Sequence, residues 1–355
     1  MRRQREAFEE SRDGKGDADL SASVRDRPSA HELFGDTRKH EFLITRILGN
    51  DLHPRHDARQ TIENLRFILD TEAEFPGAKK LFIVNRIFNP DSESAVLDAL
   101  SRAGAEYVHL PFEPSEYRAK RWDEDGPGGE TALGLIAGRG LSRQEVLQVR
   151  LLSGASKIRY AMNVNGARNL ALSIGKPLAR WTLPLDGNCI LTEEAFSRLA
   201  EQVRSEPLAS HVVLPFERLE HNSQFHQRDP IGRSDEEPQI AFHHRSPLEF
   251  DERFPYGLRD KAELLIRLGV PGAWHDWPTI RWLPQEHPQS CLGDFKLSDA
   301  KIFRLSSGQH GLERKSAQKQ RYRTRNEAIF STLLYLDELT DAPDRDLGQR
   351  IVNAG

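Results

Sequence analysis

The chain has 355 residues and a formal net charge of −4, with 37% hydrophobic and 29% charged residues. This composition is typical of a globular protein that buries a substantial core, either as one large α/β domain with insertions or as two domains. The small negative charge offers no electrostatic footprint for nucleic acid, so we expect no nucleic-acid partner. Only two cysteines occur, Cys189 and Cys291, which excludes a disulfide scaffold and a cysteine-rich metal site.

The first 40 residues are highly charged and nearly free of large apolar side chains. They lack the apolar core of a secretory signal, and we expect a disordered leader over residues 1–40. No run of about 18 apolar residues occurs, so we expect no transmembrane segment. By default these features predict a cytoplasmic protein, and they leave contact with a membrane surface open.

Strands and helices alternate in the first half of the chain. The predicted elements are a strand at 42–48 that stops at Gly49-Asn50-Asp51, a helix at 61–69, a strand at 80–84 followed by Asn85-Arg86, a helix at 92–102 with Asp91 as its N-cap, and a strand at 106–110. This spacing predicts a parallel sheet, and because the crossovers in such units are right-handed, we expect a doubly wound α/β fold with helices on both faces.

The alternation breaks over residues 113–160, which we interpret as an inserted region that forms a lid or an acceptor-side wall. Within it, 141–160 is predicted to be helical, with Ser142 as a cap. The elements predicted after the insertion are a helix at 193–203 capped by Thr192, strands at 212–216, 239–242 and 301–305, and helices at 264–268 and 326–339. The domain division that follows is 1–40 for the leader, 41–300 for the catalytic domain and 301–355 for a C-terminal part packed on it.

Residues 163–190 form the most informative stretch. A helix that starts with Gly166-Ala167-Arg168-Asn169 leads into an apolar strand, which ends in Asp186-Gly187-Asn188. In open α/β folds the carboxyl ends of strands form the edge where ligands bind, and helix N-termini attract anions. The alternatives are a plain β-turn at Asp186-Gly187-Asn188 and a surface role for Arg168.

Residues 250–269 contain Phe250-Asp251-Glu252, then Arg259-Asp260 ahead of a helix that ends in Arg267-Leu268-Gly269. Taken with the 163–190 stretch, this order resembles the family-2-type glycosyltransferases with the A-type nucleotide-sugar-binding fold. There, a Gly-x-x-x-Ala-Arg-Asn helix leads into a strand ending in Asp-x-Asp, and a later Glu-Asp opens a helix. The resemblance covers roughly residues 41–112 and 162–280.

The resemblance implies a donor site at the sheet edge. Asn50, Asp51, Asn85 and Asp91 would hold the nucleoside, with Asn85 standing where the family has an acid. Arg168 would reach phosphate or sugar. A divalent cation, Mn²⁺ or Mg²⁺, would be held by Asp186, with Asn188 and His275 as further ligands. Asn188 departs from the acidic residue of the family. The alternatives are that Asn85 and Asp91 are turn and cap residues, and that His275 is a structural hydrogen bonder.

The resemblance also implies an acceptor side. Asp260 would be the catalytic base that takes the proton of the acceptor hydroxyl, with Arg259 in place of the family's Glu. Trp274 and Trp277 would stack on a sugar ring. The alternative for Asp260 is a helix-capping residue. The segment 314–325, with six basic residues, is either a diphosphate clamp or a solvated basic loop.

These observations predict a metal-assisted glycosyltransferase, inverting if Asp260 is the base, that moves a hexosyl or similar unit from a nucleotide-sugar donor to a glycan or lipid-linked acceptor. A second hypothesis is a non-catalytic scaffold that binds a nucleotide or glycan, because Asn85, Asn188 and Arg259 stand where the family uses acids. A third is a nucleotidyltransferase, which would use the same carboxylate at the sheet edge.

Overall fold

The computed structural model describes residues 40–123, 129, 131–138, 140–206, 208–232, 236–277, 280–283 and 294–354. The predicted leader lies outside these residues except for His40. No helix in the described ranges has the length and apolarity to cross a bilayer. The division into a 41–300 domain and a 301–355 part stays a prediction.

The central sheet has seven strands in the described part of the chain, in the order β3-β2-β1-β4-β8-β6-β9. Its strands are β1 (His40–Leu48), β2 (Ala78–Asn85), β3 (Tyr107–Leu110), β4 (Ala179–Asp186), β6 (His211–Leu214), β8 (Gln239–His243) and β9 (Phe295–Leu297). β8 runs antiparallel to β4 and β6, and the other neighbours pair in parallel. The carboxyl ends of β1, β2 and β4 therefore meet at one edge.

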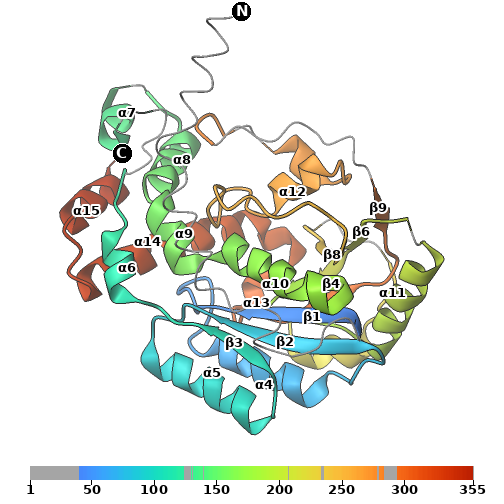
Figure 1. Ribbon diagram of the computed structural model, residues 1–355. Coiled ribbons are helices and arrows are strands. Elements are labelled where there is room, and N and C mark those ends of the chain that lie inside the picture. The colour runs from blue at the N-terminus through green and yellow to red at the C-terminus, as the bar shows by residue number, and fades with distance from the viewer. Residues whose placement is uncertain are drawn as a thin grey trace, which may run out of the picture.

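Helices cover both faces of this sheet (Figure 1). On one face, α10 (Val164–Leu178) and α12 (Ala262–Arg267) pack on alternate strand residues, among them Leu43 of β1. On the other face lie α4 (Gln60–Thr71), α5 (Pro90–Arg102) and α11 (Glu193–Ser205), against residues such as Phe42 and Leu48. The period of two along β1 assigns neighbours to opposite faces. The predicted fold class, a doubly wound and mostly parallel α/β sheet, is confirmed.

Two of the three helix N-caps predicted from the sequence are confirmed by the structure. Ser142 forms a capping box with Glu145, and Thr192 accepts a hydrogen bond from the Ala195 amide at 3.0 Å. The prediction of Asp91 as the cap of α5 is wrong. Asn89 caps this helix by accepting from the Ser92 amide at 2.9 Å, because Pro90 occupies the first helical position and Asp91 falls inside the first turn.

Pro215 divides the strand predicted over 212–216. The part before it is β6, and the part after it, β7 (Phe216–Arg218), joins a separate sheet with β5 (Cys189–Ile190) and β10 (Ile302–Arg304). In this sheet Arg304 pairs with Cys189, three residues beyond Asp186. The small sheet therefore carries Arg304 to the end of β4.

The inserted region and the C-terminal helices share one core. Its helices are α6 (Pro114–Ala119), α7 (Ala132–Gly138), α8 (Arg143–Ser153), α9 (Ala155–Met162), α14 (Gln318–Leu339) and α15 (Arg345–Asn353). They lie together at one side of the sheet in Figure 1. The shorter helical turns are η2 (Asn222–Gln227), η3 (Ala273–Asp276), α13 (His310–Glu313) and η4 (Lys315–Ala317). The basic segment 314–325 is thus mostly helical, in η4 and the start of α14, and not a loop.

A buried carboxylate joins the two parts of this core. Asp337 of α14 accepts hydrogen bonds from the Tyr117 hydroxyl at 2.9 Å, the Trp122 indole N–H at 2.7 Å and Lys157 Nζ at 2.8 Å. Asp344 lies 3.1 Å from the same ammonium group. A fully buried Lys requires such partners, since an unpaired charge in the interior is costly.

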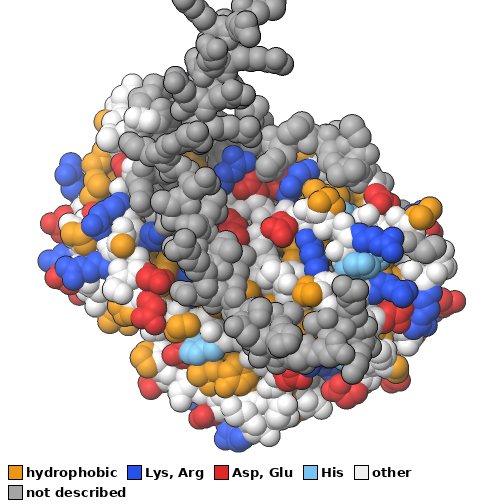
Figure 2. Space-filling model, in the orientation of Figure 1, with side chains coloured by type: hydrophobic (Ala, Val, Ile, Leu, Met, Phe, Trp, Pro, Cys, Tyr) orange, Lys and Arg blue, Asp and Glu red, His pale blue; other side chains and the backbone are white. Residues whose placement is uncertain are grey.

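The surface carries both signs of charge. Among the described side chains visible in Figure 2, acidic and basic residues are interspersed. This pattern agrees with the small net charge.

Candidate functional site

Two carboxylates from distant parts of the chain meet at one guanidinium. Arg168 of α10 donates from Nη2 to Asp186 Oδ1 at 3.0 Å and from Nη1 to Asp260 Oδ2 at 3.1 Å. Asp186 is the last residue of β4, and Asp260 lies two residues before α12. Arg168 is 4% exposed, so it is held inside the fold with its charged end toward the sheet edge. The carboxylates predicted for the metal and for the base therefore lie side by side.

Further polar groups fix the Asp186 carboxylate. Its Oδ2 accepts from Gln239 Nε2 at 3.3 Å and from Lys261 Nζ at 3.4 Å. Burial alone would raise the pKa of Asp186, but Lys261, Arg168 and Arg304 hold it well below its ordinary range. Asp186 is therefore an ionised carboxylate throughout the physiological pH range.

The turn after Asp186 needs a glycine for a steric reason. A Cβ on Gly187 would lie 2.5 Å from the backbone oxygen of Ile47, because the end of β4 passes close to the end of β1. Asp186-Gly187-Asn188 therefore forms a tight turn and also contributes residues to the candidate site.

We expect Gly187→Ala to lower the free energy of unfolding by about 1–3 kcal/mol, because either strand end must shift to admit the methyl group. Gly49→Ala is the matched control at the same sheet edge, since nothing lies within 4 Å of a Cβ there. Urea denaturation of both variants measures the difference. Equal stabilities of the two variants would show that the turn is not tightly packed.

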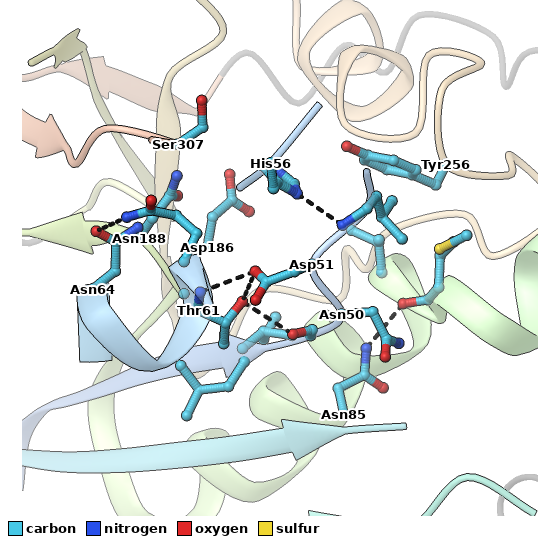
Figure 3. Close-up of a pocket in the computed structure, with 18 of the residues that line it drawn as sticks. Asn50, Asp51, His56, Thr61, Asn64, Asn85, Asp186, Asn188, Tyr256 and Ser307 are labelled. Atoms are coloured by element: carbon cyan, nitrogen blue, oxygen red, sulfur yellow. Dashed lines mark hydrogen bonds between the residues drawn. The ribbon is translucent and has the colours of Figure 1, made fainter. Parts of the chain in front are cut away.

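A cavity of about 170 Å³ opens beside Asp186 at the carboxyl edge of the sheet. Figure 3 shows side chains from the end of β1, from α4 and from the end of β4 converging on it. The predicted residues on its wall are Asn50, Asp51, Asn85, Arg168, Asp186 and Asn188. A second cavity of about 580 Å³ shares lining residues with the first, among them Asn50 and Asp51, and Asp91 lines it. All six residues predicted for the donor therefore surround these two cavities.

The amides at the strand ends are largely engaged in holding loops. Asn50 donates to the Arg86 backbone oxygen at 2.7 Å and accepts from the Phe88 amide at 2.9 Å. Asn85, 2% exposed, donates to the Met162 backbone oxygen at 2.9 Å. These amides tie β1, β2 and α9 together at the cavity floor.

Asp51 anchors the start of α4. Its Oδ1 accepts from the Thr61 amide at 2.9 Å and from the Thr61 hydroxyl at 2.7 Å. Burial raises the pKa of Asp51, and the hydrogen bonds from Thr61 oppose that effect.

The five residues predicted from the 259–277 segment, Asp260 among them, are not part of the wall of either cavity. His275 Nε2 contacts the Val270 backbone oxygen at 2.9 Å, and a metal role for it stays a prediction. Trp274 is 4% exposed and its indole N–H donates to the same oxygen at 2.8 Å, so its buried ring has no face free for a sugar. Trp277 is partly buried, and its backbone oxygen accepts from Arg259 at 2.9 Å.

The residues at Asp186 do not fit a divalent cation. Both of its oxygens already accept hydrogen bonds from cationic or amide donors. The described residues contain no group of three His, Cys, Asp or Glu side chains placed to hold a metal. A divalent ion on this carboxylate would also lie beside the positive charges of Arg168, Lys261 and Arg304.

Several residues of the site were missed at the level of sequence. His56, Tyr256, Arg304 and Ser307 line the cavity, and Lys261 bonds to its central carboxylate. Lys261 directly follows Asp260, and Arg304 lies within the strand predicted over 301–305, so both positions fall in segments that the sequence had marked. His56 and Tyr256 lie in loops where no periodic pattern marks them.

His56 gives the fold a dependence on pH. Burial, with Arg55 and Arg304 nearby, lowers the pKa of His56 to about 3, and its Nδ1 accepts from the Leu52 amide at 3.2 Å. Below pH 6.5 the unfolded chain takes up a proton that the folded chain refuses, so stability falls as the pH falls toward 3.

We expect the wild-type protein to lose up to about 2 kcal/mol more unfolding free energy between pH 7 and pH 5 than His56→Gln, which cannot titrate. Urea denaturation at the two pH values measures this, and the other histidines cancel because both proteins contain them. Equal losses in both proteins would show that His56 titrates normally in the fold.

Comparison with known proteins gives distant structural likenesses. No protein-family model and no curated protein sequence matches the chain. Its structure is similar to TarS 1–349 from S. aureus, with 8% identity, a TM-score of 0.37 and coverage of 88% of this chain and 69% of that one. The same fragment in complex with UDP-GlcNAc has 7% identity and a TM-score of 0.25, with coverage of 50% of this chain and 35% of that one. This chain spans 42% of the longer TarS structure.

It is also similar to the mannosyltransferase PcManGT from Pyrobaculum calidifontis in complex with GDP-Man and Mn²⁺, with 11% identity, a TM-score of 0.34 and coverage of 77% of this chain and 65% of that one. The solved structures named here thus include the class of protein predicted from the motifs. At these values they carry no functional argument, and the function proposed below depends on the residues of the site.

Proposed function

We propose that this protein is a glycosyltransferase that moves a hexosyl or similar unit from a nucleotide-sugar donor to a hydroxyl acceptor. The observation that carries the proposal is the pair of carboxylates, Asp186 and Asp260, held by Arg168 beside a cavity at the carboxyl edge of the sheet. In open α/β folds this edge is the usual ligand site.

The two cavities suit the two halves of a nucleoside diphosphate. The larger cavity combines apolar side chains, Ile62, Phe88 and Val96, with the carboxylates of Asp51 and Asp91, which suits a base and a ribose. The smaller cavity holds Asp186 among cationic side chains, which suits a diphosphate and the sugar attached to it. The donor would lie across both.

In the proposed reaction, Asp260 takes the proton of the acceptor hydroxyl as its oxygen attacks the anomeric carbon, which gives inversion. Arg168 orients the two carboxylates by donating one hydrogen bond to each. The acceptor, a glycan or a lipid-linked sugar, would approach past Asp260. A non-catalytic nucleotide-binding scaffold is the second candidate, favoured by the full pairing of Asp186 and by Asn188 in place of an acid.

Thermal unfolding against a panel of nucleotide sugars, each with and without Mn²⁺, tests the donor site. A donor that binds only the folded state at about 100 times its dissociation constant raises the melting temperature by about 4 °C for a chain of this size. We expect one nucleotide to give such a shift. The matching free sugar and nucleobase should give none. No shift with any nucleotide sugar would contradict both the transferase and the scaffold.

A further inference from the structure

Arg304 lies on the cavity wall, and one donor of its guanidinium has no hydrogen-bond partner among the described residues. It ends β10 and lines the same cavity as Asp186, Asn188 and Ser307. Its side chain is partly buried, and its buried Nε has no hydrogen-bond partner in the part of the chain that the structure describes. Because a buried charged donor without an acceptor is costly, its presence at a cavity wall indicates an anionic ligand.

The other two cations of the site differ from Arg304 in this respect. Arg168 donates to Asp186 and Asp260, and Lys261 donates to Asp186. Among the described residues, the Arg304 Nε has no such acceptor, although Asp186 and Glu236 lie near enough to act on its charge. Burial would lower the pKa of Arg304, but Asp186 and other neighbours raise it, so the guanidinium is charged at all physiological pH values.

A neutral role in packing does not account for this arrangement. The Arg304 guanidinium lies 5.6 Å from the centre of the Phe216 ring, a weak contact that leaves its edge free for hydrogen bonds. The pairing of β10 with β5 and β7 fixes the backbone of Arg304 beside Cys189, close to the end of β4. The backbone from which the guanidinium extends is thus fixed in place before any ligand arrives.

We propose, resting on the proposed function, that Arg304 binds the donor diphosphate directly, and that fixed side-chain cations supply at this site the positive charge that the motif resemblance assigns to a divalent cation. A guanidinium suits this role because its planar N–H groups match phosphate oxygens. The diphosphate would accept hydrogen bonds from the part of the guanidinium that reaches the cavity wall.

The charge balance of the transfer step shows what Arg304 contributes. The bond between the anomeric carbon and the diphosphate oxygen breaks, and its electron pair stays on the diphosphate. The acceptor oxygen forms the new bond to the anomeric carbon, and its proton passes to Asp260. Negative charge therefore develops on the leaving diphosphate, where Arg304 and Lys261 offset it without a metal ion.

Calorimetric titration in EDTA and in Mn²⁺ tests this proposal on the wild type, Arg304→Gln and Arg304→Lys. The ligands are the nucleoside diphosphate and the nucleoside of the donor base. We expect the wild type to bind the diphosphate in EDTA within about threefold of its affinity in Mn²⁺. Arg304→Gln should weaken the diphosphate by about 10- to 100-fold, a typical loss for a charge-assisted hydrogen bond, and leave the nucleoside unchanged. Arg304→Lys should recover part of the loss.

Thermal unfolding without ligand separates binding from folding. Because Arg304 Nε has no partner in the fold, Arg304→Gln should keep or raise the melting temperature of the free protein. Arg198→Gln removes an exposed arginine of α11 and should change neither measurement.

Two results would overturn the proposal while the donor site stands: diphosphate binding that requires Mn²⁺, and an Arg304→Gln variant that binds the diphosphate as the wild type does. Failure of the wild type to bind any nucleoside or nucleoside diphosphate would instead remove the proposed function itself, and this inference with it.

Discussion

Replacing Arg168 by leucine is expected to lower the free energy of unfolding by about 3–5 kcal/mol and to abolish nucleotide-sugar binding. Arg168 is 4% exposed and is the shared partner of Asp186 and Asp260. Its loss leaves two neighbouring carboxylates in a largely buried setting, with Lys261 and Arg304 as the remaining cations that act on Asp186. Urea denaturation measures the first effect, and thermal shift with the nucleotide sugar measures the second.

Two further variants show whether unpaired carboxylates cause the loss. Arg198→Leu removes an exposed arginine paired with Glu194 and should cost at most about 0.5 kcal/mol. The triple variant Arg168→Leu, Asp186→Asn, Asp260→Asn removes the unpaired charges and should recover part of the stability. A triple variant no more stable than the single one would mean that packing of Arg168, and not its charge, stabilises the site.

Replacing Asp337 by alanine is expected to cost about 3–5 kcal/mol, because it removes the acceptor of three buried donors. The Trp122 indole N–H loses its acceptor, the Tyr117 hydroxyl keeps the Leu333 backbone oxygen at 3.1 Å, and Lys157 keeps Asp344 at 3.1 Å. Since these donors belong to the inserted region and Asp337 belongs to α14, the variant should loosen the contact between the two.

Hydrogen exchange over residues 114–162, together with urea denaturation, measures this effect. Glu338→Ala is the matched control, since it removes the same charge one residue along α14 at an exposed position. Loss of protection should be confined to Asp337→Ala. Equal exchange in both variants would show that the polar network does not hold the insertion to the C-terminal helix.

The first half of the fold followed from the sequence because its signals are local. Apolar runs at 42–48 and 80–84, with a helical face at 61–69 between them, specify β1, α4 and β2 with no knowledge of distant contacts. The cap of α5 was misplaced because Asn89, Pro90 and Asp91 all favour a helix start, and only the backbone shows which residue comes first.

The contacts between distant segments were not predictable in the same way. That α14 would extend back through the basic segment 314–325 depends on its packing against the inserted helices, which supplies a buried face that the local sequence does not show. The break at Pro215 is visible in the sequence, but the transfer of 216–218 to a second sheet depends on β10, about 85 residues later.

The two acids of the site and Arg168 were predicted, whereas Lys261 and Arg304 were missed. Asp186 was selected for its place at a strand end and Asp260 from the motif resemblance, and the structure brings both to one guanidinium. Arg304 was missed because its importance depends on what it lacks, a hydrogen-bond partner, and that is visible only in three dimensions.

The release of nucleoside diphosphate from nucleotide sugars, measured by chromatography for the wild type and Asp260→Asn, is the most direct test of glycosyl transfer at this site. We predict that the wild type releases the diphosphate from one donor, slowly to water and faster with an acceptor. Asp260→Asn should bind this donor with similar affinity and release it at least about 100-fold more slowly. Tight binding without release by the wild type would instead indicate a scaffold, and pyrophosphate released from a nucleoside triphosphate would indicate a nucleotidyltransferase.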